Sequence, residues 1–512
     1  MSENASNKVL LLEAGHRKLN PLLHIPGGYF KTIFDRRINW NYKTQPEKNL
    51  NGREVLWPRG RLLGGTGSIN GMVYIRGQKD DYNDWKSFGN SEWGFESVLP
   101  YFKKSEKQHI KNIVRDNKFH SSSGLLSITD YPDKHFLCDA FIKASEELNV
   151  KKNNDFNGAT QDGAGYYQIT TKNWLRSDTL AAYLFPVRRR PNLKILTDAH
   201  ITKIIIKNKR AVGVEYLYSN QLMNLKSSRE VILCAGTINS PQILQLSGIG
   251  ESQYLKTHGI EPVYNSPEVG KNLQDHLQCQ LVYKCAQPIS INDDLLSFSR
   301  KLKLAFRYIF FHTGPLAGGP SPAGAFLKSS ATKSRPDIQL HFLPLSLQRP
   351  GVLDTFSGYT FNVSQSRPLS RGEINIISPH PCDPPEIVAN YLEDPFDKLT
   401  LINGMNVARK IGKATAFDQF RASEERPGSS VNSYIEMLNY VRENSTSLYH
   451  PVGTCRMGAD DTAVVDQYLR VKGINGLRVA DASIMPQIIS GNTNAATIMI
   501  AERAADFIKF GK

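Results

Sequence analysis

Long apolar runs are absent from this chain of 512 residues. No stretch of about 18 uncharged apolar residues occurs, which argues against a transmembrane helix. The first residues also lack the apolar segment of a secretory signal peptide. We therefore expect a cytoplasmic protein, with peripheral attachment to the inner face of the membrane as the open alternative.

Cysteine is scarce as well. The spacing of the six cysteines matches no paired metal-binding motif, and we expect reduced thiols and no bound metal. They are Cys138, Cys234, Cys279, Cys285, Cys382 and Cys455.

Acidic residues are outnumbered, 48 against 63 basic residues, which gives a net charge of +15. Such an excess raises nucleic acid or an anionic membrane as partners. The basic residues are dispersed, however, and no nucleic-acid-binding motif accompanies them. We expect no nucleic-acid partner and keep membrane contact as an open alternative.

The chain does contain a strand that is typical of nucleotide-binding folds. Residues 8–15 form an apolar run that ends in Glu13 and then Gly15. In a dinucleotide-binding βαβ unit, the second strand ends in an acidic residue that binds the adenosine ribose. The glycine-rich turn should precede that strand by roughly 20–30 residues, but only residues 1–7 precede it here. The sequence thus predicts a nucleotide-binding unit that is incomplete at its start.

Short apolar strands alternate with helices and long irregular segments, which predicts an α/β fold with α+β insertions. We expect strands over 192–196, 201–207, 211–218 and 230–235. The last of these ends in small residues, as strands do where they face a ligand crevice. Residues 314–324 are rich in proline and glycine and predict an ordered loop or lid rather than a linker.

The densest feature of the first half is the segment 57–74, with four glycines between positions 60 and 67. Glycines let the backbone approach a flat or anionic ligand and offer bare N–H groups to it. A tight turn explains such a string as well. Residues 235–250 similarly read as a strand end, a turn and a short helix, which fits a packed connection or a cofactor contact equally.

The C-terminal region adds one histidine and one helix start. His450 lies in a stiff loop of small residues at 447–458, although a lone loop histidine is more often structural than catalytic. Residues 490–494 lead into a helix that we expect from about 495 to 509. Its N-terminus can stabilise an anion. Its apolar face is expected to pack in the core and comprises Ile498, Ala501, Ala505 and Ile508.

Together these segments resemble the glucose–methanol–choline (GMC) oxidoreductase family. The stretches 60–83 and 236–250 are similar to its two diagnostic motifs, and His450 and residues 492–494 are similar to its C-terminal region. The resemblance runs from Val9 to Phe507 and is strongest to bacterial choline dehydrogenase-like and aliphatic alcohol dehydrogenase members. It implies an FAD-binding Rossmann-like domain, discontinuous in sequence, plus a substrate domain built on a mostly antiparallel sheet with helices. We divide the chain into an N-terminal region (1–275), a substrate-domain segment with a lid (276–365) and a C-terminal region (366–505).

The resemblance also implies a reaction, the oxidation of a primary alcohol, choline or an aliphatic alcohol, to the aldehyde. A neutral His450 would take the hydroxyl proton while hydride passes to flavin N5. Asn494 matches the second catalytic position, and a quinone or another carrier would accept the electrons. The residues carried over as contacts of FAD are Glu13, Gly65, Thr66, Asn70, Gly71, Met72, Val73, Ile201, Ala235, Asp481, Ala482 and Thr493.

Two departures from the family pattern lead to further expectations. Ile69 stands where some family oxidases carry a flavin-linked histidine, so FAD should be bound non-covalently. The missing glycine turn should remove an anion site and leave two sheet edges exposed. The alternatives are a truncated, flavin-deficient remnant or binding protein, and an alcohol oxidase that uses oxygen.

The insertion segments should decide the substrate, and no residue clearly commits the pocket to a quaternary ammonium group. Residues 302–311 are apolar enough for a lid or a membrane contact. A core helix is the plainer expectation for them.

Overall fold

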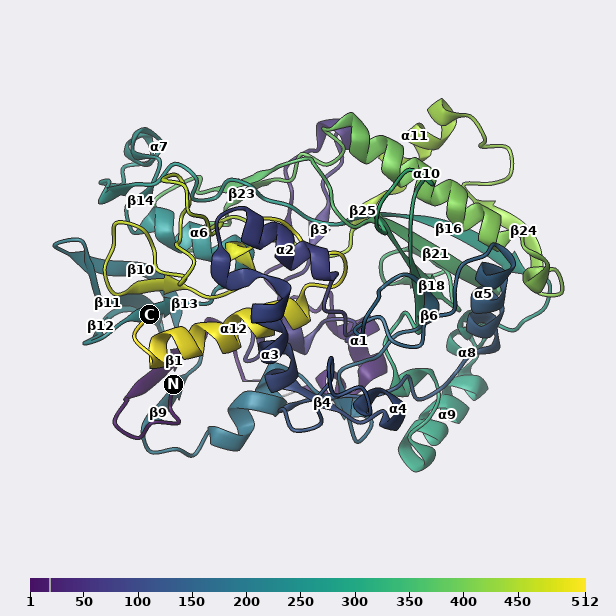
Figure 1. Cartoon of the computed structure of the whole chain (residues 1–512), viewed down its shortest axis with the longest axis horizontal. Helices are drawn as coiled ribbons and strands as arrows, with labels where there is room; N and C mark the ends of the chain where they lie inside the picture. The colour runs from purple at the N-terminus through teal and green to yellow at the C-terminus, as the bar shows by residue number, and fades with distance from the viewer. Residues whose placement is uncertain (18–19) are drawn as a thin grey trace.

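Two lobes lie side by side in the computed structural model, which describes residues 1–17 and 20–512 (Figure 1). The first lobe holds parallel strand pairs and a small antiparallel sheet. The second is built on one large antiparallel sheet with helices packed against it. The expected α/β fold with α+β insertions is confirmed.

The parallel strand pairs of the first lobe join distant parts of the chain. Strand β1 (Val9–Leu12) pairs with β9 (Leu193–Leu196), and β13 (Val231–Leu233) pairs with β26 (Leu477–Val479). Helix α12 (Asn494–Lys509) packs against α3 (Phe95–Ser105) in the same lobe. Because β26 and α12 come from the end of the chain, this lobe is discontinuous in sequence, as predicted.

The remaining sheet of this lobe is a meander of β10 (His200–Lys207), β11 (Arg210–Tyr218) and β12 (Gln221–Lys226). The strands expected from position 201 to 218 are therefore present. Helix α6 (Gly236–Leu246) follows β13 and packs on β10. Other helices of the lobe are α2 (Lys79–Ser87) and α7 (Ser252–Thr257).

Two strand edges of the first lobe are open. Within the described part of the chain, β1 and β13 each have a single partner strand, and both border one large cavity. The face of α12 that we expected in the core borders this cavity as well, and Ala501 on it is exposed. The expectation is therefore correct for Ile498, which is buried in the core of the lobe, and wrong for Ala501, while Ala505 and Ile508 are partly buried. The open edges of β1 and β13 agree with the expectation of exposed sheet edges, and β9 and β26 likewise have one partner strand each among the described residues.

The second lobe draws strands from all three regions of the sequence. Its sheet has seven strands among the described residues, and all of their pairings are antiparallel. The order is β24 (Arg421–Arg426), β16 (Leu277–Cys285), β21 (Gly358–Gln365), β18 (Ile338–Leu343), β17 (Ala323–Leu327) and β6 (Gly163–Tyr166), with β25 (Thr446–Ser447) beside β16.

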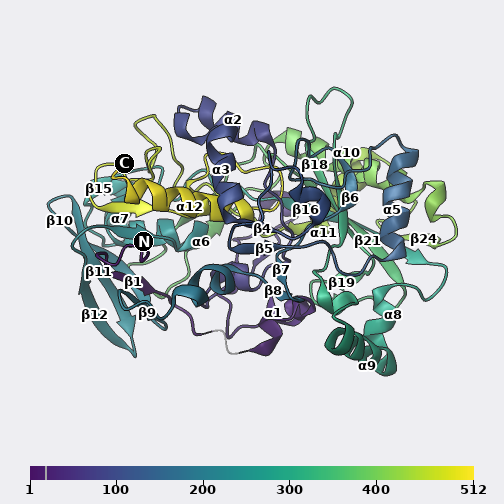
Figure 2. The ribbon, with the colours of Figure 1, turned by 60° about the horizontal axis from the view of Figure 1, so that its bottom comes forward.

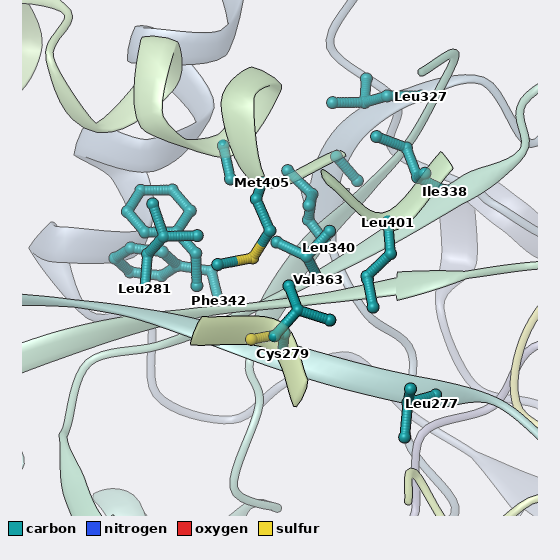
Figure 3. Packing of buried hydrophobic residues seen from close by; sticks show 14 of the residues in the cluster. Leu277, Cys279, Leu281, Leu327, Ile338, Leu340, Phe342, Val363, Leu401 and Met405 are labelled. Carbon is teal, nitrogen blue, oxygen red and sulfur yellow. The ribbon is translucent and has the colours of Figure 1, made fainter. Parts of the chain in front are cut away.

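Strand alternation gives this sheet an apolar face and a polar face. Cys279, Val363 and Leu340 lie in one register row, and the core of the lobe forms on their side against Leu401 and Met405 (Figure 3). The side chains of Leu401 and Met405 come from α10 (Pro395–Gly412). Asp394 caps this helix by accepting a hydrogen bond from the N–H of Phe396.

The opposite face of the sheet carries polar side chains toward the cavity. Gln280, Asn362 and His341 form the neighbouring register row, and all three line the cavity. The same sheet thus builds the hydrophobic core on one side and a polar wall on the other. Three further helices belong to this lobe: α5 (Phe136–Glu147), α8 (Ile291–Leu296) and α11 (Tyr434–Asn444).

One helix stands apart. Helix α9 (Phe298–Phe306) and the π-helical turn η8 (Arg307–Phe311) lie at the margin of the second lobe next to α8 (Figure 2). The side chains of Leu302, Ile309 and Phe310 are 57 to 63% exposed. The expectation of a core helix over 302–311 is therefore wrong, since only Leu304 and Tyr308 of this segment are buried.

Short elements complete the fold. They are α1 (Tyr29–Thr32) and α4 (Lys111–Val114), and the pairs β2 (Tyr42–Lys43) with β3 (Leu56–Trp57), β4 (Glu106–Gln108) with β5 (Leu126–Ile128), β7 (Thr171–Lys172) with β8 (Leu175–Arg176), β14 (Ile249–Gly250) with β15 (Tyr264–Asn265), β19 (Leu347–Arg349) with β20 (Val352–Leu353), and β22 (Glu373–Asn375) with β23 (Glu386–Val388). No helix in the described ranges combines the length and apolar character that a membrane span requires.

Candidate active site

A cavity of about 2600 Å³ extends between the two lobes and brings the predicted site residues together. It is larger than the roughly 300–1,000 Å³ of most small-molecule sites. Every residue proposed from the sequence lines it: Glu13, Gly65, Thr66, Asn70, Gly71, Met72, Val73, Ile201, Ala235, His450, Asp481, Ala482, Thr493 and Asn494.

The glycine-rich segment forms a tight turn at the cavity wall. Gly64 and Gly65 have φ angles of +91° and +55°, which favour glycine, and a Cβ at Gly60 would lie 2.4 Å from the Gly65 backbone. The N–H of Gly60 donates to the Thr66 hydroxyl at 3.1 Å. The turn therefore places backbone directly against the cavity at Gly65.

The next residues are held by one side-chain amide. The Asn70 Oδ1 accepts from the Met72 N–H at 3.0 Å and from Arg176 at 2.8 Å. Met72 adopts a φ of +65°, a strained value for a side chain other than glycine. Ile69 lines the cavity as well and is buried against Leu23 and Leu62.

Glu13 lies at the end of β1 with one oxygen bound to its own chain. Its Oε1 accepts from the Gly15 N–H at 2.7 Å. Burial raises the pKa of Glu13 to about 7. A partly buried carboxyl group at the cavity wall is suited to accept hydroxyl groups of a ligand, as the resemblance implies for ribose.

Asp481 has a structural task that the sequence did not reveal. Its carboxylate accepts from the N–H of Gly236 at 2.9 Å and from the hydroxyl of Ser240 at 2.6 Å, so it ties the start of α6 to the end of β26. Thr493 occupies the N-cap position of α12 without a capping side-chain hydrogen bond among the described residues, and Asn494 is the first residue of the helix. The positive end of this 16-residue helix points at the cavity, where it favours negative charge.

His450 is buried in a loop that a carboxylate fixes. The Asp275 Oδ1 accepts the backbone N–H of His450 at 2.7 Å, and its Oδ2 accepts the hydroxyls of Ser447 and Tyr391. Burial, with smaller contributions from His276 and His341, holds the pKa of His450 well below that of an ordinary histidine. The ring is therefore neutral at pH 7 and free to act as a base.

The neighbouring His276 determines which nitrogen of His450 carries hydrogen. His276 Nε2 lies 2.9 Å from the carbonyl oxygen of Ser366, which can only accept, so Nε2 is protonated. Burial lowers the pKa of His276 to about 4, so its Nδ1 bears a lone pair. That atom lies 3.1 Å from His450 Nδ1, which must donate. The lone pair of His450 therefore resides on Nε2.

The group that contacts this lone pair is Asn492, not Asn494. The Asn492 amide donates to His450 Nε2 at 3.1 Å. Asn494 lines the same cavity, and its Oδ1 would lie 3.8 Å from a Cβ at Gly67, on the glycine-turn side. The sequence analysis assigned the second catalytic position to Asn494, whereas the amide that contacts His450 Nε2 is that of Asn492, two residues earlier.

Three residues beside His450 were missed as site residues: His276, Asn492 and His341. His341 lines the cavity from β18, and its Nε2 is buried without a hydrogen-bond partner within the described chain. Burial lowers its pKa to about 3. Strand alternation could have placed His341 on the polar face. No local signal distinguishes His276.

A nucleotide-binding lobe, a polar sheet and a neutral buried histidine meet at this cavity, which defines the class of the protein as a flavin-dependent oxidoreductase. The fit to FAD rests on the backbone exposed at the glycine turn, the half-satisfied Glu13 carboxylate and the α12 N-terminus. These groups suit, respectively, a flat or anionic cofactor surface, ribose hydroxyls and a site of negative charge.

Comparison with known proteins gives the family. The chain matches the GMC oxidoreductase models over residues 15–278 and 368–501 and belongs to that family. It is an enzyme acting on CH–OH donors, and FAD is its cofactor. An alcohol dehydrogenase [acceptor] of Pseudomonas putida is 43% identical over 99% of this chain and 92% of that protein. An oxygen-dependent choline dehydrogenase of Brucella anthropi is 39% identical with the same coverage.

Solved structures agree with this assignment. A structure of Aspergillus oryzae formate oxidase, concerned with modification of its FAD, superposes with a TM-score of 0.92 at 25% identity. The match covers 100% of this chain and 95% of the formate oxidase.

The buried histidines predict how stability depends on pH. His276 and His341 have folded pKa values near 4 and 3, and the pKa of His450 is also lowered. The unfolded chain, with histidine pKa values of about 6.5, binds more protons below that pH. These groups therefore contribute stability above about pH 6.5 that is lost as pH falls toward 4, at up to about 1.4 kcal/mol per pH unit each. Thermal unfolding from about pH 7.5 to 4.5 measures the loss.

Substitution isolates the histidine contribution from that of the carboxylates. His341→Asn should flatten the fall of the unfolding temperature below pH 6.5, whereas His380→Asn on the surface should leave the slope unchanged. Equal slopes for His341→Asn and the parent protein would contradict the prediction.

Proposed function

We propose that this enzyme oxidises a primary alcohol to the aldehyde, with His450 Nε2 as the proton acceptor. The observation that carries the proposal is the hydrogen-bonded series from the Ser366 carbonyl through His276 and His450 to Asn492. It leaves one neutral imidazole with its lone pair facing a cavity amide.

The residues support each part of this proton transfer. A substrate hydroxyl takes the place of the Asn492 amide at His450 Nε2 and gives up its proton there. His450 then carries a positive charge. The hydrogen bond from its Nδ1–H to the lone pair on His276 Nδ1 stabilises that charge. The freed Asn492 amide donates to the developing alkoxide oxygen without adding charge. FAD, when bound, accepts the hydride from the carbinol carbon.

The remaining site residues hold the cofactor in this proposal. Glu13 would bind the adenosine ribose, with Ile201 near adenine. The residues that would line the pyrophosphate, the ribityl chain and the isoalloxazine are Gly65, Thr66, Asn70, Gly71, Met72, Val73, Ala235, Asp481, Ala482 and Thr493. Asn494 would lie at the helix end that faces the cofactor rather than at the base.

We propose an uncharged aliphatic alcohol as the substrate in preference to choline. The residues of the large sheet that line the cavity are Gln278, Gln280, His341, Leu343, Asn362 and Thr446, and none is a carboxylate, although Glu54 and Glu443 line the cavity from outside this sheet. A quaternary ammonium group is recognised by aromatic faces together with negative charge. The P. putida relative is named for alcohols and the B. anthropi relative for choline, so both substrates are represented among similar enzymes.

The electron acceptor is proposed to be a quinone or another carrier, following the word acceptor in the name of the P. putida relative. The alternative, an oxidase that reduces oxygen, is represented by the solved formate oxidase. Release of hydrogen peroxide during alcohol turnover in air would favour the oxidase.

Purified protein should carry non-covalent FAD, because the buried Ile69 offers no atom to attach it. We expect absorbance bands near roughly 370 and 450 nm that survive gel filtration, as for any oxidised flavin. Acid precipitation should release the yellow colour into the supernatant. Colour that stays with the precipitate would contradict non-covalent binding, and a colourless protein would favour a flavin-deficient remnant or binding protein.

His450→Ala should retain the flavin bands and slow their bleaching by alcohol by about 10²–10⁴-fold, because the base is lost. Asn492→Ala should slow the same step by about 10²-fold through loss of the alkoxide donor. Stopped-flow absorbance near 450 nm under anaerobic conditions measures both. Unchanged bleaching in His450→Ala would overturn the base assignment.

Asn494→Ala distinguishes the two asparagines. The geometry predicts a smaller effect on flavin reduction than for Asn492→Ala. The reverse order would return the partner role to Asn494.

Substrate class is tested with linear primary alcohols and choline on the same enzyme. We expect kcat/KM for a medium-chain alcohol to exceed that for choline by about 10-fold or more, the factor that 1.4 kcal/mol provides. A higher kcat/KM for choline would contradict the proposal.

A further inference from the structure

An apolar stripe faces solvent on α9 and η8. Its members, the α9 patch, are Phe298, Leu302, Phe306, Ile309, Phe310 and Phe311, each 53 to 77% exposed. The first four are spaced by four, four and three residues, which places them on one side of a helix. The patch is therefore continuous rather than a scatter of single side chains.

The orientation of this helix is the reverse of the usual one. A surface helix normally buries its apolar stripe and exposes its polar side. Here Leu304 and Tyr308 anchor the inner side, at 5% and 7% exposure, while the larger apolar side chains remain outside. Contiguous apolar patches on a protein surface mark an interaction site.

Positive charge surrounds the patch. Residues 295–312 include Arg300, Lys301, Lys303 and Arg307 and contain no Asp or Glu. Arg300 forms an ion pair with Asp294 at 3.8 Å, and Arg307 forms one with Asp133 at 3.3 Å. In the ranges that the structure describes, neither lysine forms an ion pair, and both are exposed. A lysine or arginine near an anionic bilayer contributes about 1 kcal/mol to binding.

A tryptophan extends the patch. Trp174 is 43% exposed, and its ring stacks on His312, the residue that follows η8. The hydroxyl of Tyr308 donates a hydrogen bond to the carbonyl oxygen of Trp174 at 3.1 Å. The adjacent Leu175 is 40% exposed. Tryptophan favours the boundary between headgroups and acyl chains, where one part of the ring is apolar and the other is hydrated.

We propose that the α9 patch docks on an anionic lipid bilayer, with its apolar side chains at the boundary of the headgroups and the basic residues on the phosphates. A second copy of this chain fits the patch poorly, because a two-fold contact would bring Lys301 and Lys303 against the same charges of the partner. The chain continues from η8 to Pro320 and Ser321 in the cavity wall.

Vesicle flotation of the full-length protein tests this surface. Vesicles of phosphatidylcholine with about one quarter phosphatidylglycerol provide the anionic bilayer. The parent protein should float with them, and the triple variant Leu302→Ser, Phe306→Ser, Phe310→Ser should bind on the order of 10-fold more weakly. Lys301→Gln with Lys303→Gln should weaken binding to these vesicles while leaving weak binding to pure phosphatidylcholine unchanged.

A matched control removes three exposed apolar side chains elsewhere, Phe88→Ser, Ile435→Ser and Phe510→Ser, which are 50 to 70% exposed. This control should float like the parent protein, and circular dichroism should show all variants folded. Equal flotation of the α9 triple variant and the parent would overturn the proposal, as would failure of the parent to bind. A dimer in gel filtration that the triple variant abolishes would assign the patch to a second copy instead.

Discussion

The carboxylate of Asp275 is the interaction on which the geometry of the site depends. It accepts from the hydroxyls of Tyr391 and Ser447 and from the backbone N–H of His450, so two separate segments of the chain converge on its two oxygens. A carboxylate buried without such partners would be costly, which restricts the loop to one arrangement. The following residue, His276, then fixes the ring of His450. Two consecutive residues thus position the backbone and the side chain of the same histidine.

Much of the fold and of the candidate site could be predicted because it depends on local sequence patterns. The strands at 192–196 and 211–218 follow from apolar runs bounded by turns, and the glycine turn follows from its composition. The predicted site residues lie together because the ends of β1, β13 and β26 and the start of α12 meet at one cavity. Period-two alternation also explains why Gln280 and Asn362 face the cavity while Cys279 and Val363 face the core.

What could not be predicted depends on distances across the fold. His276 and His450 are separated by 174 positions, and no local signal relates them. Asn492 and Asn494 belong to one short motif, and only the three-dimensional arrangement shows which amide reaches His450. The helix at 302–311 was expected in the core because its composition is apolar. Composition does not determine which side of a helix meets solvent, and here the inner anchors are only Leu304 and Tyr308.

The pairing of β13 with β26 has a consequence for synthesis. Strand β13 comprises Val231–Leu233, and its partner β26, Leu477–Val479, leaves the ribosome much later. Contacts between such distant segments form slowly, because the intervening chain must first be ordered. The cofactor lobe therefore cannot be completed until β26 has left the ribosome, whereas α5, β16 and β21 can assemble earlier. A nascent or prematurely terminated chain exposes an incomplete nucleotide-binding lobe. Its exposed apolar surface and unpaired strand edges are then accessible to chaperones and proteases.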